Sequence, residues 1–414
     1  MSHLVVEGRL VDPEWGPRWG QLEIRQGHIT RVGDLGLRPD LKFSENELVF
    51  PGFVDVHVHL RQGDEHKEDY QTATRAALQG GICCMLDMPN NPVPPLNAED
   101  LRVKQERVVD LPIDIGFYLG VGPGSRPSGH RHYKAYMGPS IGPLFFHDDD
   151  ELEEAVRHYR GCRLTFHCED PQMLRDFADR AEHEEQRPPE AEQKAVETAL
   201  RLARRHGFLV HVAHLSQSDS LGTLLQASRE LWPDDQGLPG VVWEVTPHHL
   251  YFDRENRRSA PRDAFLKMNP PLRRPEHRQR LLQAVLDDQV TFLSTDHAPH
   301  TVEEKSSKNP SGVPLLDTHG AFAAWLLHQG LSPRQLCALA CERPGRFSGF
   351  RVGRLRPGYR GHLAVLDPNR PWTVRAEEVH TRCAWSPFEG LTLPGRVTCT
   401  VASGRVFRAG LEVT

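Results

Sequence analysis

Short apolar segments alternate with helical segments through the middle of this chain, and this alternation most constrains its fold. We predict strands at residues 53–59, 82–88, 113–119, 132–137, 162–168, 208–214, 241–247 and 291–296. Helical stretches such as 69–79 and 192–205 lie between them. About eight strand–helix units in succession predict an α/β fold, a (β/α)8 TIM barrel over residues 51–350. A doubly wound sheet is the alternative, but it would not place polar side chains at nearly every strand end.

The two ends of the chain have a different pattern. Residues 1–50 and 351–414 contain short strand-like pieces that are separated by turn residues. We expect these two ends to pair into one small β-sandwich domain beside the barrel. The barrel would be the catalytic domain.

Composition excludes several classes of function. The 414 residues include 50 basic and 56 acidic side chains, a net charge of −6, which offers no general footprint for nucleic acid or an anionic membrane. No apolar run approaches the roughly 18 residues of a membrane span, and the N-terminus lacks the pattern of a signal peptide. The eight cysteines show no Cys-x-x-Cys spacing, so a reduced, cytoplasmic location fits best.

Two histidines, His57 and His59, close the first predicted strand. Residues i and i+2 of a strand point to the same face, so both imidazoles can reach one metal ion. Pro51 and Gly52 precede the strand as a turn. Taken alone, the pair is also compatible with two partly buried histidines that bind nothing.

Further ligand-type side chains stand at the ends of later predicted strands. They are Lys134 on the fourth strand, His167 on the fifth, His211 and His214 on the sixth, His248 and His249 on the seventh, and Asp296, His297 and His300 on the eighth. The carboxyl ends of barrel strands meet at one mouth. Imidazole and carboxylate groups gathered there predict a site for one or two zinc-like cations.

These motifs resemble the amidohydrolase superfamily and, more closely, the dihydroorotase family. The resemblance extends from Pro51 to Gly390. The residues that carry it are His57-Val58-His59-Leu60-Arg61, Asp87-Met88-Pro89-Asn90, Lys134-Ala135-Tyr136-Met137-Gly138, Glu244 to Leu250, Asn269-Pro270-Pro271-Leu272-Arg273, and Asp296 to His300 followed by Glu304-Lys305.

The resemblance implies a site with two zinc ions. Its implied ligands are His57, His59, Lys134, His167, His214 and Asp296. Lys134 would be carbamylated (a carboxylysine) and bridge both ions, because a carbamate supplies oxygen ligands where an ammonium group would be repelled. The alternative for Lys134 is an ordinary salt-bridged lysine. The family pattern selects His214 over His211.

His211, His248, His249 and His297 are expected to orient neighbours or fill the core rather than bind metal. Asp55 is a candidate partner of the ligands.

The implied activity is the reversible hydrolysis of dihydroorotate to N-carbamoyl-L-aspartate in pyrimidine (UMP) biosynthesis. Asp296 would be the proton shuttle, taking a proton during attack and returning it to the ring nitrogen. Arg61, Asn90 and His300 would hold the substrate carboxylate, and Asn269 would lie near the ring. A guanidinium suits that role because it binds a carboxylate with two hydrogen bonds.

Two other functions stay open. A dihydropyrimidinase (hydantoinase) or an allantoinase would share the metal ligands, but a neutral ring would leave Arg61 unpaired. A catalytically silent scaffold for an aspartate transcarbamoylase is the second alternative, and such a partner is also possible for an active enzyme. The family suggests a homodimer. Gln62-Gly63-Asp64 and Asn91 depart from the common family pattern, and both lie in loops near the expected substrate pocket.

Overall fold

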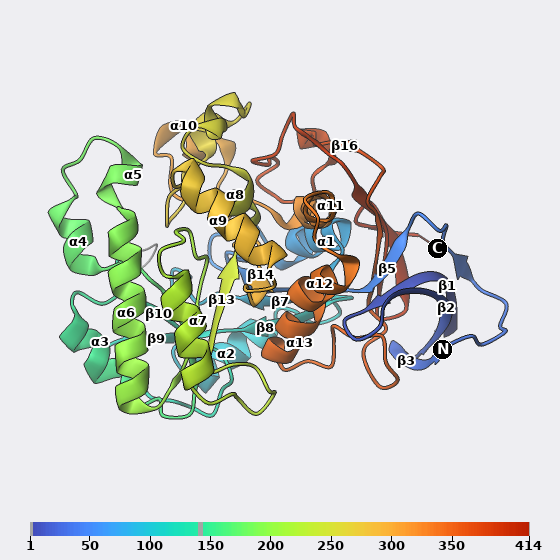
Figure 1. The fold of residues 1–414 in the computed structure, drawn as a ribbon, viewed down its shortest axis with the longest axis horizontal. Helices are drawn as coiled ribbons and strands as arrows, with labels where there is room; N and C mark the ends of the chain where they lie inside the picture. Colours follow the sequence, from blue (N-terminus) through green and yellow to red (C-terminus); the bar gives the residue numbers. More distant parts are fainter. Residues whose placement is uncertain (1–2, 140–143, 414) are drawn as a thin grey trace.

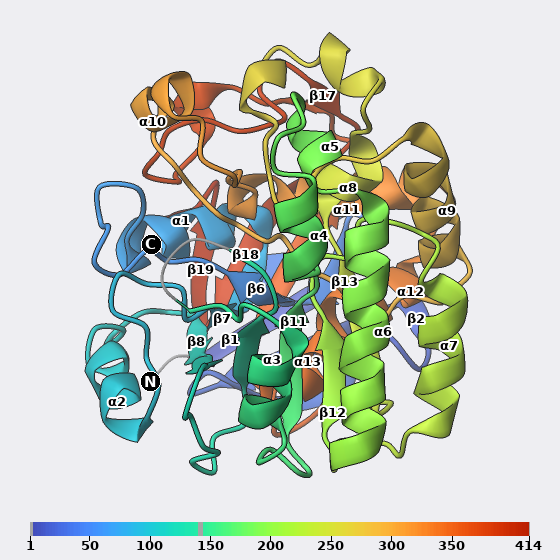
Figure 2. The same ribbon diagram turned by 90° about the vertical axis from the view of Figure 1, so that its left-hand side faces the viewer.

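The computed structural model describes residues 3–139 and 144–413. Parallel strands fill the centre of the molecule, and helices surround them (Figures 1 and 2). The central strands are β6 (Phe53–Val58), β7 (Ile82–Asp87), β8 (Asp114–Phe117), β9 (Leu119–Val121), β10 (Tyr133–Tyr136), β11 (Arg163–His167), β12 (Leu209–Val212), β13 (Val241–Val245) and β14 (Phe292–Leu293). Each predicted strand overlaps at least one of these, so the predicted strand positions are confirmed.

The central strands form two parallel sheets, ordered β6-β7-β8 and β14-β13-β12-β11-β10-β9. The third predicted strand is divided into β8 and β9 at Tyr118, whose hydroxyl donates to the Val56 carbonyl at 2.9 Å. An isolated bridge between Val58 and His297 brings the first strand next to the segment after the last one. A single closed ladder around the barrel stays a prediction, because the described residues pair in two sheets.

Helices cover the strands, and several of them are amphipathic. In α6 (Pro189–His206), the buried side chains include Ala195, Ala199 and Leu202, and Gly207 ends the helix with φ 76°. The others are α1 (Tyr70–Gly80), α2 (Ala98–Gln105), α3 (Asp149–Val156), α4 (Pro171–Asp176), α5 (His183–Gln186), α7 (Leu221–Glu230), α8 (Pro247–Tyr251), α9 (Pro275–Leu286), α10 (Val302–Ser307), α11 (His319–His328), α12 (Pro333–Cys337) and α13 (Arg343–Ser348).

The two ends of the chain meet in one sheet beside the central strands (Figure 1). It contains β1 (His3–Asp12), β2 (Gly16–Arg25), β3 (His28–Gly33), β4 (Leu41–Lys42), β5 (Leu48–Pro51), β15 (Leu363–Asp367), β18 (Arg396–Ala402), β19 (Arg405–Arg408) and β20 (Leu411–Glu412). Antiparallel pairing of β5 with β15 joins the N-terminal to the C-terminal strands, as predicted. Two stacked layers, and domain boundaries near 50 and 350, stay predictions.

The sheet has its own apolar core, which includes Val6, Leu22, Val49, Leu363 and Val401. A further short pair, β16 (Trp372–Thr373) with β17 (Thr392–Leu393), lies apart from it. In the part of the chain that the structure describes, no helix combines the length and apolarity needed to cross a bilayer.

Candidate metal centre

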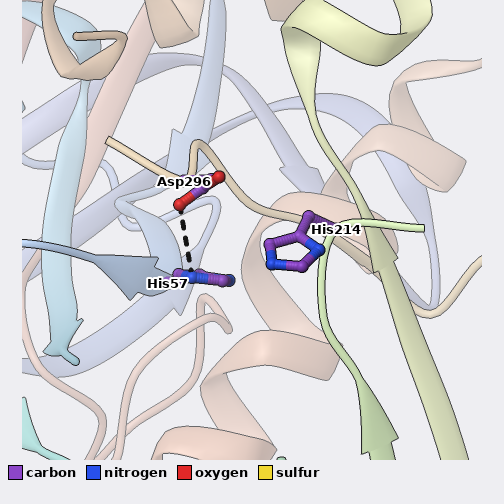
Figure 3. Close-up of side chains that lie close together, drawn as sticks. All are labelled: His57, His214 and Asp296. Carbon is purple, nitrogen blue, oxygen red and sulfur yellow. Dashed lines mark ion pairs between the residues drawn. The ribbon is translucent and has the colours of Figure 1, made fainter. Parts of the chain in front are cut away.

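Three ligand-type side chains converge beyond the carboxyl ends of the central strands. His57 lies on β6, His214 follows β12 and Asp296 follows β14, and Figure 3 shows the three facing one another. Each offers one ligand atom, and these atoms all lie within 4.8 Å of one another. Asp296 Oδ1 is 3.3 Å from His57 Nε2 and 3.1 Å from His59 Nε2. The geometry suits one cation held by two imidazoles and a carboxylate.

Strained backbone accompanies these side chains. His214 has φ 37°, Asp296 has φ 49° and Arg61 has φ 56°, all in the left-handed region that non-glycine residues rarely adopt. Each such residue costs of the order of 1–3 kcal/mol, and such residues concentrate at functional sites. The apolar packing of the central strands must therefore offset this backbone strain.

His167 and His214 form a second close pair. His167 Nδ1 lies 2.9 Å from His214 Nε2, and His214 Nδ1 has no hydrogen-bond partner among the described residues. The other nitrogen of His167 lies 2.7 Å from Glu169 Oε2, and Glu169 is also paired with Arg187. Burial lowers the pKa of both histidines, so their rings are neutral, as metal binding requires.

Glu244, at the end of β13, orients this cluster. Its carboxylate bonds to His57 Nδ1 and accepts from the backbone N–H of His214 at 3.0 Å. Burial alone would raise its pKa, but His57 and His211 outweigh burial and hold the pKa well below its usual range. The ionised carboxylate keeps Nε2 of His57 turned toward Asp296. Reasoning from the sequence assigned Glu244 no role, although its position at the end of an apolar strand was an available signal.

Lys134 is fully buried on β10, and its ammonium group has no hydrogen-bond partner among the described residues. Burial lowers its pKa to about 8, which increases the share of the free amine near neutral pH. A buried ammonium group without a hydrogen-bond partner is unfavourable unless a bound group or a chemical modification compensates for its charge. The orphaned Lys134 nitrogen, the neutral imidazoles and the carboxylate therefore fit a bound divalent cation.

Arg61, Asn90 and His300, three of the four predicted substrate-binding residues, connect to this cluster. Arg61 is 5% exposed and has no ion-pair partner among the described residues, and it donates from Nε to the Pro299 carbonyl at 3.1 Å. Its Nη2 lies 3.4 Å from His300 Nε2, so the structure brings these two together. Asn90 Oδ1 instead contacts His59 Nδ1 at 2.5 Å, and Asn269 Oδ1 accepts from Ser311 Oγ at 3.0 Å.

The remaining histidines make hydrogen bonds within the protein. His211 Nδ1 lies 3.0 Å from the Thr165 hydroxyl, and His297 Nε2 lies 3.1 Å from Glu68 Oε2. His248 and His249 both contact Thr246 Oγ1. These contacts agree with the expectation that they orient neighbours.

Asp55 accepts from the backbone N–H of His57 at 3.1 Å and also binds the Thr295 hydroxyl. It therefore holds the backbone of one candidate ligand, His57, and the residue that precedes another, Asp296.

Comparison with known proteins agrees with this arrangement. The chain belongs to the amidohydrolase family, whose model matches residues 48–407. It is 30% identical to a dihydroorotase of Pyrococcus abyssi, over 100% of this chain and 95% of the relative. It is 33% identical to a dihydroorotase of Pyrobaculum aerophilum, over 92% and 93% of the two chains.

Among solved structures, the L-hydantoinase (dihydropyrimidinase) of Arthrobacter aurescens superposes with a TM-score of 0.90 at 24% identity. The alignment covers 100% of this chain and 98% of the hydantoinase. Family and fold together identify the central strands and helices as an α/β fold of the TIM-barrel type.

Proposed function

We propose that this chain is a dihydroorotase, which interconverts dihydroorotate and N-carbamoyl-L-aspartate in pyrimidine biosynthesis. The observation that carries the proposal is Arg61, a buried guanidinium without an ion-pair partner among the described residues, at the edge of a cluster of metal-type ligands. A buried, unpaired positive charge favours a substrate that brings a carboxylate. Full-length similarity to dihydroorotases supports the same substrate.

The proposed cofactor is a pair of zinc ions. One ion would be held by His57, His59 and Asp296. The other ion would be held by His167 and His214. Carbamylated Lys134 would be a ligand of both ions. When bound, such ions acidify a water molecule and polarise the carbonyl group of the ring amide.

The chain's own residues would then bind the substrate and move the proton. Arg61, Asn90 and His300 bind the ring carboxylate, and Asn269 lies near the ring. Asp296 accepts a proton from the attacking water and passes it to the departing ring nitrogen. Ring closure consumes a proton, so acid favours dihydroorotate and alkali favours hydrolysis. A cytoplasmic homodimer, with or without an aspartate transcarbamoylase partner, completes the proposal.

Hydrolysis of hydantoin-type rings is the second candidate, because the solved structures with similar folds include hydantoinases. Consumption of dihydroorotate, hydantoin and allantoin by zinc-loaded protein at mildly alkaline pH separates the candidates. We expect turnover of dihydroorotate alone. Turnover of hydantoin or allantoin without turnover of dihydroorotate would indicate a hydantoinase or an allantoinase. No turnover of any of the three substrates, with both ions bound, would favour a catalytically silent scaffold for an aspartate transcarbamoylase.

Arg61→Met should reduce kcat/KM for dihydroorotate by about 30-fold to several thousand-fold, the effect of removing one partner of a buried charge pair. Steady-state kinetics measure the change. Arg107→Met removes an exposed guanidinium that pairs with Glu65, and it is the control. Unchanged kinetics in Arg61→Met would mean that another group holds the carboxylate.

Removal of metal should abolish turnover. After dialysis against a chelator, zinc with bicarbonate should restore activity, whereas zinc in carbon-dioxide-depleted buffer should restore much less, because the Lys134 carbamate needs carbon dioxide. Metal analysis should find two ions per chain in the reactivated protein. Full activity in protein with less than about a tenth of an ion per chain would contradict the proposed centre.

A further inference from the structure

Lys305, on α10, is a buried cation without a carboxylate partner in the described part of the chain. It is 2% exposed, and its Nζ donates to the carbonyl oxygens of Pro310 at 2.8 Å, Gly312 at 3.2 Å and Lys267 at 3.3 Å. These bonds use all three N–H groups of the ammonium. Burial, together with the charges of Lys267 and Arg257, lowers the pKa of Lys305 to about 7. A buried lysine held by three backbone carbonyls, and not by a carboxylate, requires a structural or functional reason.

The carbonyls that Lys305 binds belong to the segment 309–313 and to the chain just before Asn269. Gly312 adds a backbone hydrogen bond to the Lys267 carbonyl at 2.8 Å. Lys305 therefore ties the segment to the chain that leads into Asn269.

The segment 309–313 also contacts two of the proposed substrate-binding residues. Ser311 Oγ donates to Asn269 Oδ1 at 3.0 Å, and the Ser311 carbonyl lies 3.1 Å from His300 Nε2. Val313 accepts from the backbone of Ala298, two residues before His300, at 3.0 Å. The segment 309–313 thus contacts both Asn269 and His300 and helps to position their side chains.

The approach of this segment to the strand ends is close. Gly312 has φ 136°, and a Cβ atom there would lie 2.4 Å from the Ala298 carbonyl oxygen. Only glycine fits at this position. Because the segment is packed this closely against Ala298, a small displacement of the segment must also move the residues it contacts.

We propose that Lys305 is a positioning residue for substrate binding, which holds the segment 309–313 so that Asn269 and His300 meet the substrate. Lys305 itself does not touch the reacting atoms. The proposal rests on the proposed function, since that function assigns the two residues to the substrate. It goes further in naming the residue that sets their positions.

The test is Lys305→Met, with Lys308→Met as the matched control on the exposed end of the same helix. We expect KM for dihydroorotate to rise about tenfold or more and kcat to change less than about threefold. A rise in KM with little change in kcat is the pattern for loss of an interaction that binds the ground state and the transition state equally. Metal content should stay as in the wild type. In hydrogen exchange, the Gly312 amide should exchange at least about tenfold faster, with unchanged protection in β6 and β11.

Gly312→Ala is the second variant, in case Lys305→Met does not fold. It displaces the segment while leaving Lys305 in place, and it should raise KM in the same way. Unchanged KM and unchanged exchange in Lys305→Met would overturn the proposal. A joint fall of kcat, metal content and melting temperature would also overturn it, because that is the result for a general structural role. If wild-type protein does not turn over dihydroorotate, the proposed function fails, and the exchange of Gly312 alone decides whether Lys305 anchors the segment.

Discussion

Asp296→Asn should lower kcat for dihydroorotate by about 10²–10⁴-fold, the usual contribution of a general acid–base group. Asp296 lies within 3.1–3.3 Å of both His57 and His59, so its carboxylate is close to any group that these imidazoles hold. Asparagine keeps the shape and tolerates the φ of 49°, but it cannot accept a proton. Alanine would be a poorer probe, because it would add strain to the chemical change.

Metal analysis and thermal melting separate the loss of a proton shuttle from the loss of a ligand. An inactive Asp296→Asn protein that still binds two ions would support the shuttle, whereas a protein that lost one ion would show a ligand role. Asp287→Asn makes the same chemical change at the exposed end of α9 and should leave kinetics unaltered. Activity within about tenfold of the wild type, with both ions bound, would place the shuttle elsewhere.

The positions of the central strands could be predicted because parallel strands are buried on both faces. They therefore appear as continuous apolar runs, as in β12 and β13, where every residue is buried. The polar residues that follow these runs stand out by contrast. They include His57, His214 and Asp296, although only the family resemblance selected His214 over His211. The structure brings ligand atoms of these three residues within 4.8 Å of one another.

The sequence could not reveal how the cluster is oriented, because orientation depends on contacts between distant segments. Glu244 meets His57 across 187 positions of the chain, and no local pattern marks that contact. The contact of Asn90 Oδ1 with the ring of His59, across 31 positions of the chain, is not marked by a local pattern either. The left-handed backbone of Asp296 is equally hidden, since aspartate is common in ordinary turns.

Lys134→Met should abolish turnover and, in metal-free protein, increase the free energy of unfolding. The ammonium of Lys134 is buried without a hydrogen-bond partner among the described residues, and methionine fills similar space without a charge. Removal of an unsatisfied buried donor is worth about 1–3 kcal/mol, and more for a charged one. Activity should fall because the carbamate that would hold both ions cannot form. Denaturant melts of chelated protein in carbon-dioxide-depleted buffer measure the stability.

Lys104→Met is the matched control, because Lys104 is also buried but is paired with Asp87 at 2.7 Å and donates to Asn91 at 2.8 Å. Breaking that pair leaves a buried carboxylate uncompensated, so Lys104→Met should destabilise the protein by about 3–5 kcal/mol. The two substitutions are chemically identical, and their opposite signs isolate the effect of the missing partner. Destabilisation by Lys134→Met of similar size would mean that the ammonium itself stabilises the metal-free fold. In that case the lysine would have a structural role, and its selection as a metal bridge would lose its main physical support.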